Sequence, residues 1–475
     1  MSFKRIIDTA FDMDAPVPKD DSVGNYQYFA YKAIEPNASG RIDLQVQDKS
    51  KYFLPCEAYI EVEGEILLKR NGNPYPANAT VGFVNNGIMA LFEGAKYMID
   101  GNDIESVNNG IDVATTILGL ARYSDDYTRS AGPTMMFAKD TSDYPNAIQY
   151  VKRALKKTSN DAENADVEPI IDGFNPNYNV GYVTRNGMLK GERRNFSCAI
   201  PLSHIFGFCR NVRKVIYGAK HTVVLQRRTD SNSAIWRIPA NNTDENTEAE
   251  DDATVVLSKL TLWMPVLTPS LAVNQRLLSW METGASSLIS WLNTSTDSLE
   301  SSQTEFTWNL AGKRGISAPR HIFITLQRKD RTQGRDQQTR SHMIFDRLDV
   351  TEVSLRINGQ QEPAEPIKLR SNNNENSVAR VYHRLWSFMG RDQNVDTGLQ
   401  ISQHDFQTLY PIYYFSLEHL DMTKESVVDI TFNAVVGEVP AGGYRAFAVI
   451  LYDKSMLIEG IGGQMRLIDA PVENM

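Results

Sequence analysis

The sequence predicts an all-β protein built from two β-sandwiches in tandem, and three observations lead to this prediction. Apolar and polar residues alternate in many short segments, which is the pattern of a strand with one buried face. Helical patterns are few and short, which favours sandwiches over a sheet of alternating strands and helices. The chain of 475 residues is too long for one comfortable core and suits two domains.

The strand pattern is present in both halves of the chain. Apolar side chains occupy every second position of residues 42–46, 353–357 and 428–436, as an antiparallel sheet with one wet face requires. Asp100-Gly101 and Asn358-Gly359 each follow a run of this kind. Both dipeptides predict hairpins, because the tight turn between two strands needs positive φ.

Three short helices are expected between the strands. One occupies residues 111–123. A second would be capped by Asp143 and extend to Leu155, with its apolar side chains on one face. A third follows Ser270 and stops near Gly284.

A faint internal repeat suggests that the two halves follow one sandwich plan. The runs 92–101 and 345–359 both begin with phenylalanine and end in a hairpin turn. The runs 217–227 and 321–328 are both rich in aliphatic residues and end in Leu-Gln-Arg. The predicted division of the chain is an N-terminal arm (1–33), a first sandwich (34–267), a connector with a short helix (268–299) and a second sandwich with a C-terminal tail (300–475).

Composition excludes several classes of protein. The formal net charge of −9 argues against a strongly basic nucleic-acid binder. Three cysteines without CxxC spacing argue against a disulfide framework and a cysteine-rich zinc site, and indicate a reducing compartment. The first residues do not have the pattern of a signal peptide, and no segment approaches the roughly 20 apolar residues of a membrane span.

Enzyme motifs are not found, so we expect no catalytic residue, cofactor or metal. Residues 311–315 contain Gly-Lys without the other positions of a phosphate-binding loop. The glycines of 460–463 are not followed by a helical pattern and are expected in a turn. The seven histidines are scattered, without metal-ligand spacing, and are expected to be surface or structural residues.

Basic clusters are the one candidate for a binding site. The clearest is Lys152, Arg153, Lys156 and Lys157, which would lie together on the helix after Asp143. The simpler interpretation of such clusters is a solvated face or ion pairs between subunits. The functional interpretation is a patch that faces packaged nucleic acid and contacts phosphates without reading the base sequence.

Several segments, taken in order, resemble the double-jelly-roll major capsid proteins of Polinton-type elements and adintovirus-like viruses. Residues 199–209 and 215–225 resemble the late strands of the first jelly roll in that family. Residues 260–265 resemble the strand that closes it, and 318–324 resemble the opening of the second jelly roll. The matching order covers about residues 30–470, while 287–292 depart from the family pattern.

The resemblance implies two tandem jelly-roll sandwiches and a role as a structural capsid subunit without catalytic residues. Three copies would form a pseudo-hexameric capsomer, and capsomers would pack into an icosahedral shell around a DNA genome. The partners would be further copies of the chain, a penton or minor capsid protein, and packaged DNA in non-specific contact. The protein would be made in the host cytoplasm and reside in the virion.

Two other functions stay open from the sequence. A host-domesticated copy of a capsid gene would keep the fold but could lose assembly. A carbohydrate-binding sandwich would need aromatic side chains clustered on one exposed face, and a sugar-cleaving one would also need paired carboxylates. The tryptophans are dispersed along the sequence, which argues against this alternative.

Overall fold

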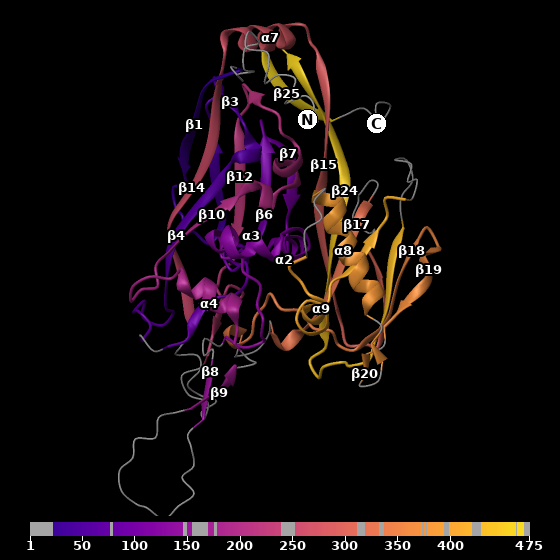
Figure 1. Ribbon diagram of the computed structural model, residues 1–475. Helices are drawn as coiled ribbons and strands as arrows, with labels where there is room; N and C mark the ends of the chain where they lie inside the picture. Colours follow the sequence, from indigo (N-terminus) through magenta and orange to yellow (C-terminus); the bar gives the residue numbers. More distant parts are fainter. Residues whose placement is uncertain are drawn as a thin grey trace, which may run out of the picture.

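The fold consists of two β-sandwiches that stand side by side, with helix α7 (Leu271–Glu282) across one end of both (Figure 1). We describe it from a computed structural model. No helix in the described part of the chain is both long and apolar enough to span a membrane. The described residues are 22–76, 79–145, 150–153, 170–174, 178–238, 252–310, 319–331, 337–369, 371–372, 375–376, 378–393, 399–419, 429–461 and 463–469.

The first sandwich has two antiparallel sheets. In one sheet β14 lies between β1 and β4, β4 pairs with β10, and the short strands β3 and β11 extend the sheet. The other sheet has the order β2-β12-β6-β7. These strands are β1 (Val23–Lys32), β2 (Gly40–Val46), β3 (Tyr52–Phe53), β4 (Tyr59–Leu68), β6 (Phe92–Ile99), β7 (Asn102–Val107), β10 (Phe196–Pro201), β11 (Ile216–Tyr217), β12 (His221–Arg227) and β14 (Ala253–Pro269).

The second sandwich repeats this arrangement. One sheet has the order β15-β24-β17-β22, with β25 also paired to β24, and the other has the order β16-β23-β18-β19. The strands are β15 (Ser286–Ser301), β16 (Glu305–Asn309), β17 (Pro319–Arg328), β18 (Val350–Ile357), β19 (Gln360–Lys368), β22 (Tyr413–Ser416), β23 (Ile430–Val436), β24 (Tyr444–Ile461) and β25 (Gln464–Asp469).

Both sandwiches therefore share one strand order. Numbered along the chain and without the short extra strands, one sheet of each is first-eighth-third-sixth and the other is second-seventh-fourth-fifth. This is the order of an eight-stranded jelly roll, in which two sheets face each other across one core. The predicted all-β fold class with two tandem jelly rolls is confirmed.

The internal repeat is confirmed in one place and wrong in the other. The hairpins β6–β7 and β18–β19 are the fourth and fifth strands of their sandwiches. Their turn residues Asp100, Gly101, Asn358 and Gly359 all have positive φ, as predicted. The two Leu-Gln-Arg runs are not equivalent, because β12 is a seventh strand and β17 is a third strand. Buried strands are rich in apolar residues at every position of a sandwich, so a three-residue match does not show that two strands are equivalent.

The helices and remaining short strands lie in the connections. Helix α2 forms where the sequence predicts one. The α-helices of the described residues are α2 (Ile111–Arg122), α3 (Asp125–Ser130), α4 (Val180–Gly187), α5 (Leu202–Ile205), α6 (Gly207–Asn211), α7 (Leu271–Glu282), α8 (Ala379–Gln393) and α9 (Gln403–Thr408). Three two-stranded sheets pair β5 (Val81–Phe83) with β13 (Ile235–Arg237), β8 (Tyr150–Arg153) with β9 (Ile170–Phe174), and β20 (Ser371–Asn372) with β21 (Glu375–Asn376).

The helix expected from Asp143 to Leu155 is wrong over its described part. Residues Tyr150–Arg153 form strand β8, which pairs with β9 from a distant part of the sequence. Local spacing cannot reveal a partner strand that arrives some 20 residues later, and a hairpin partner outweighs a weak helix pattern.

The predicted division of the chain stays a prediction, but three details differ from it. Part of the expected N-terminal arm is β1, which pairs with β14 along its length. The expected connector is helical only in α7, since residues 286–301 form β15 and pair with β24 throughout. The second sandwich therefore opens with β15, while the segment expected to open it is its third strand, β17. Because β15 is rich in serine and threonine, its sequence does not show a clear alternation of apolar and polar residues.

Candidate functional site at the junction of the two sandwiches

Polar and apolar contacts from both sandwiches meet at the surface that joins them. This surface brings the edge strand β15 of the second sandwich against β7, α2 and α6 of the first, and α8 against α2. A single hydrophobic cluster continues through both sandwiches. Trp291 of β15, for example, packs edge-on against Phe208 of α6, with ring centroids 5.1 Å apart.

Glu105 caps the outer edge of β15, the edge strand of the second sandwich. This carboxylate lies on β7 and is buried. It accepts a hydrogen bond from the backbone N–H of Thr294 on β15 at 3.3 Å and another from Phe208 on α6 at 2.9 Å. Burial raises the pKa of Glu105, and these backbone donors oppose the shift. An edge strand that would expose unpaired N–H groups is thus closed by a side chain of the other sandwich.

Further polar contacts fix the same edge. The Leu292 N–H donates to Asn211 at 3.4 Å, and Lys454 donates to the Ile104 carbonyl at 2.6 Å. The hydroxyl of Thr296 donates to the Asn109 carbonyl. The bonds of β15 lie in the middle of the strand, from Leu292 to Thr296, and fasten it to the first sandwich.

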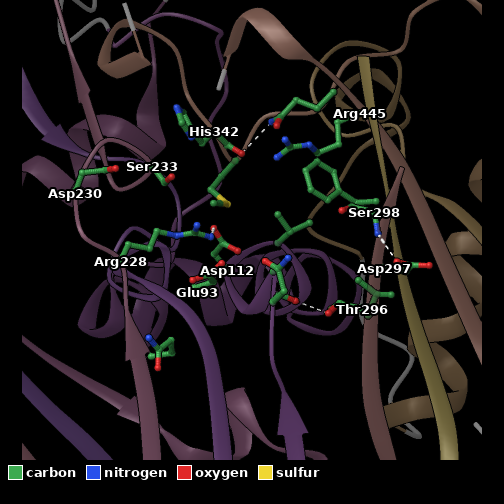
Figure 2. A pocket seen from close by; sticks show the side chains of 18 of the residues that line it. Glu93, Asp112, Arg228, Asp230, Ser233, Thr296, Asp297, Ser298, His342 and Arg445 are labelled. Atoms are coloured by element: carbon green, nitrogen blue, oxygen red, sulfur yellow. Dashed lines mark hydrogen bonds and ion pairs between the residues drawn. The ribbon is translucent and has the colours of Figure 1, made fainter. Parts of the chain in front are cut away.

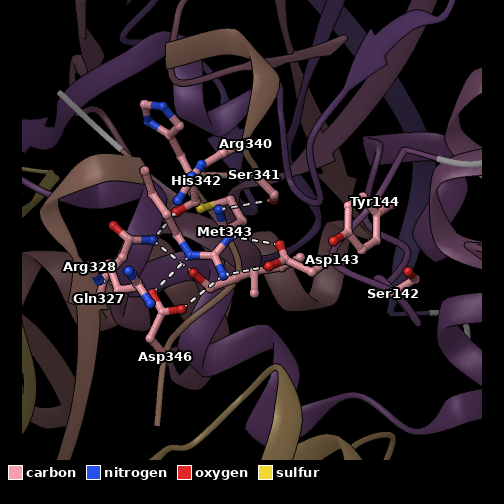
Figure 3. A network of polar contacts seen from close by, with 12 residues as sticks. Ser142, Asp143, Tyr144, Gln327, Arg328, Arg340, Ser341, His342, Met343 and Asp346 are labelled. Atoms are coloured by element: carbon pink, nitrogen blue, oxygen red, sulfur yellow. Dashed lines mark hydrogen bonds and ion pairs between the residues drawn. The ribbon is translucent and has the colours of Figure 1, made fainter. Parts of the chain in front are cut away.

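A buried arginine links the loops at the other end of the junction (Figure 3). Arg331, which follows β17, binds Asp346 of its own sandwich at 2.8 Å and reaches Asp143 of the first sandwich with two bonds of 2.7 and 2.8 Å. Burial alone would lower the pKa of Arg331, but the two carboxylates outweigh it and raise the pKa. The guanidinium therefore serves as a bidentate clamp between the sandwiches.

A second buried set of charges lies beside α9. Arg185 of α4 and Asp140 form a fully buried ion pair. Burial raises the pKa of Asp140, and the arginine opposes that shift. The Asp140 N–H donates to the Tyr410 hydroxyl at 2.8 Å, and Lys139 pairs with Asp405 of α9. These bonds again join residues from different sandwiches.

A polar cavity of about 580 Å³ opens between the sandwiches (Figure 2). Arg228 turns toward Asp112 on its first-sandwich side and binds it at 2.9 Å, while Thr296 and Arg445 line the opposite side. Its lining is mostly polar, unlike the apolar walls of typical small-molecule sites. In the described ranges, no group of three or more His, Cys, Asp or Glu could hold a metal ion.

Four of the seven histidines are buried structural residues. His204, His221 and His321 each contact a tyrosine hydroxyl at 2.7–2.9 Å. Burial lowers the pKa of His204 to about 3 and that of His221 to about 4. His342 is similarly shifted, to about 4. These neutral rings support the structural interpretation of the scattered histidines.

The predicted nucleic-acid cluster is only partly described. Lys152 and Arg153 end strand β8, on a hairpin that extends away from the sandwiches at the end opposite α7 (Figure 1). Lys156 and Lys157 lie outside the described residues. Two basic residues that each neighbour another arginine in the sequence have partners within the chain: Arg193 binds Glu65, and Arg228 binds Asp112.

Sequence reasoning missed the residues that join the sandwiches. Glu105, Asp143 and Arg331 are single charged residues in polar surroundings, without a spacing pattern. The strand of Glu105 gave no signal either, because its apolar residues Ile104 and Val107 do not alternate with polar ones.

A family model described as the double jelly roll-like domain matches residues 179–456. Among solved structures, a chain of the Sputnik virophage matches with a TM-score of 0.60 at 11% identity, covering 97% of this chain and 92% of that one. The Faustovirus major capsid protein matches with a TM-score of 0.54 at 9% identity, covering 96% and 94%. No curated protein matches the sequence.

Proposed function

Since the chain belongs to the double jelly roll-like domain family, we propose that it is the major capsid protein of a DNA virus or virus-like element. In this role it is a structural subunit without catalysis. Three copies form a pseudo-hexameric capsomer, and capsomers tile an icosahedral shell around the genome in the virion. The similarity in fold to the Faustovirus major capsid protein supports this role by analogy.

The single observation that carries the proposal is the fixed junction between two sandwiches of equal topology. One chain supplies two copies of the same wall unit, held by the Glu105 cap and the Arg331 clamp. When similar units bind head to tail, each through a different surface from its neighbour, they form a closed ring if the rotation from one unit to the next is a whole fraction of 360°. Three such chains would supply six similar units around one axis.

The proposed partners follow from this geometry. The capsomer meets further copies of itself, while five-fold vertices need a separate penton or minor capsid protein, because a three-chain unit does not fit a five-fold axis. Synthesis in the host cytoplasm belongs to the same proposal.

DNA contact through Lys152, Arg153, Lys156 and Lys157 stays a prediction that depends on orientation. Its described residues, Lys152 and Arg153, end strand β8, which lies at the end of the first sandwich opposite α7 (Figure 1). If that end faces outward, as long loops often do, the genome meets the α7 end and this cluster does not touch it. Charge reversal of the four residues with unchanged DNA content of particles would exclude the contact.

One observation bears on the carbohydrate-binding alternative. Tyr26, Tyr28, Tyr59 and Trp263 form a row of neighbouring rings on the first sheet. The rings of Tyr26 and Tyr28 are perpendicular, with an interplanar angle of 89°, and Trp263 already donates to Glu61 at 2.7 Å. A perpendicular pair does not form the flat platform on which a sugar stacks. Binding on a glycan array would favour this alternative over the capsid role.

Native mass with negative-stain microscopy tests the proposal. Three copies of 53.4 kDa give about 160 kDa, and round particles of uniform size would also support the capsid role. A protein that stays monomeric at high concentration contradicts it and favours a domesticated or sugar-binding protein.

A further inference from the structure

The junction within the chain has an open counterpart on the same molecule. Strand β15, the first strand of the second sandwich, is covered by β7, the fifth strand of the first. The corresponding first strand of the first sandwich is β1, and the corresponding fifth strand of the second is β19. Among the described residues, neither of these strands lies against the other sandwich of the chain.

Strand β1 is exposed where β15 is covered. All six residues from Val23 to Tyr28 are exposed, including Tyr26 and Tyr28 at 41% and 39%. No described strand pairs with its outer edge. The Ala33 N–H donates to Leu260 of β14, so by the alternation of an antiparallel ladder the N–H groups of Tyr28 and Ala30 point away from β14.

Glu362 occupies the position of Glu105 in the second sandwich. Glu105 pairs across its hairpin with Tyr97, the third residue before the turn residue Asp100. Glu362 pairs with Leu355, the third residue before the turn residue Asn358. The two carboxylates therefore stand at the same place in equivalent hairpins.

The surroundings of the two carboxylates also correspond. Glu105 binds Phe208 in the connection between the sixth and seventh strands of its sandwich. Glu362 lies 3.4 Å from His419, in the equivalent connection of the second sandwich. Unlike Glu105, the Glu362 side chain remains 23% exposed. It also lies 3.9 Å from Arg384 of α8. It is placed as an edge cap, but in the described part of the chain no strand edge lies against it.

We propose that Glu362 and β19 of one copy bind the outer edge of β1 of a second copy, as Glu105 and β7 bind β15 within the chain. The Glu362 carboxylate would accept hydrogen bonds from outward N–H groups near Tyr28 and Ala30. This inference rests on the proposed function, since it names the surfaces that close the capsomer. Strand β19 carries Pro363 and Pro366, so the contact uses side chains and not a continuous sheet.

Two pairs of variants test the contact from its two sides. Glu362→Lys reverses the charge at the cap, and Glu365→Lys makes the same change on the same strand at an exposed position. Ala30→Pro removes one outward N–H without touching the β14 ladder, and Ala30→Ser keeps that N–H. We expect Glu362→Lys and Ala30→Pro to raise the trimer dissociation constant at least tenfold and both controls to leave it unchanged. Sedimentation velocity over a concentration series measures this, with far-ultraviolet circular dichroism to verify folding.

Mixing the two damaged proteins gives the decisive result. An Ala30→Pro copy keeps an intact β19 face, and a Glu362→Lys copy keeps an intact β1 edge. The β19 face of the Ala30→Pro copy can therefore bind the β1 edge of the Glu362→Lys copy, while the reverse contact is damaged. The mixture should form a dimer of about 107 kDa from two 53.4 kDa chains. A wild-type trimer that all four variants also form overturns this inference alone. A wild-type protein that never associates overturns the proposed function as well.

Discussion

The first strands of the two sandwiches have the same place in the topology and opposite surroundings. Strand β15 lies against the other sandwich of its own chain and carries Ile289 and Trp291 buried. Strand β1 has no such neighbour, and its first six residues are exposed. The fold alone therefore does not decide whether an edge is buried. Burial depends on whether another sandwich lies against the edge. The exposed edge of β1 is therefore a surface on which a second copy could bind.

The largest effect should come from breaking the clamp that makes the two sandwiches one body. Arg331→Met leaves Asp143 and Asp346 without their cation, and we expect a loss of roughly 3 kcal/mol in the free energy of unfolding. Urea unfolding measures it. The control is Arg340→Met, because Arg340 is 48% exposed and binds Asp330 at the surface. Equal stability of the two variants would show that the sandwiches are not locked by this residue.

A smaller difference should separate the two edge caps. Glu105→Ala leaves the backbone N–H groups of Thr294 and Phe208 buried without acceptors, so we expect a loss of about 2 kcal/mol in the monomer. Glu362→Ala, at the open counterpart, should change monomer stability by less than about 0.5 kcal/mol. Thermal unfolding of both variants at a concentration below association compares them. Similar losses would contradict the view that only one cap is occupied within the chain.

Lowering the pH should reduce the free energy of unfolding, because each sandwich contains a buried histidine. The pKa values of His221 in the first and His342 in the second are lowered to about 4 by burial, so both stay neutral in the native state. The unfolded chain binds protons below about pH 6.5, so their stabilisation is present above that pH and is lost as the pH falls toward 4.

Replacing either buried histidine should flatten this pH dependence. His221→Phe and His342→Phe should each reduce the slope of stability by about 1.4 kcal/mol per pH unit between pH 6 and 4.5. His404→Phe serves as the control, because it makes the same replacement at an exposed position. Urea unfolding at several pH values gives the slopes. A different result for the two sandwiches would show that their cores respond to acid unequally.

The smallest effect should be equal in both halves. Gly101 and Gly359 lie in matching hairpin turns, with φ of 87° and 82°, and a Cβ added at either position would meet open space. Alanine at either position should cost about 1 kcal/mol, because only the backbone conformation is strained. Thermal unfolding of Gly101→Ala and Gly359→Ala measures both. Unequal costs would mean that the two hairpins are less alike than their register indicates.

Much of the fold could be predicted because its signals are local. Alternating apolar residues predicted the strands, and Asp100-Gly101 and Asn358-Gly359 predicted two hairpins that later proved equivalent. The helix expected over residues 111–123 is α2. The errors arose where a distant segment decides the structure: β8 depends on β9, and β15 depends on β24, which lies far away in the sequence.

The sequence by itself determined the strand pattern, the turns and the resemblance to double-jelly-roll capsid proteins, because side-chain alternation and turn chemistry act over a few residues. It could not determine the junction. Glu105, Arg331 and Glu362 are ordinary charged residues until the sheets place them at an edge or between two sandwiches. Only the tertiary structure decides which strand edge is closed and which is open, because that depends on pairing between segments far apart in the chain.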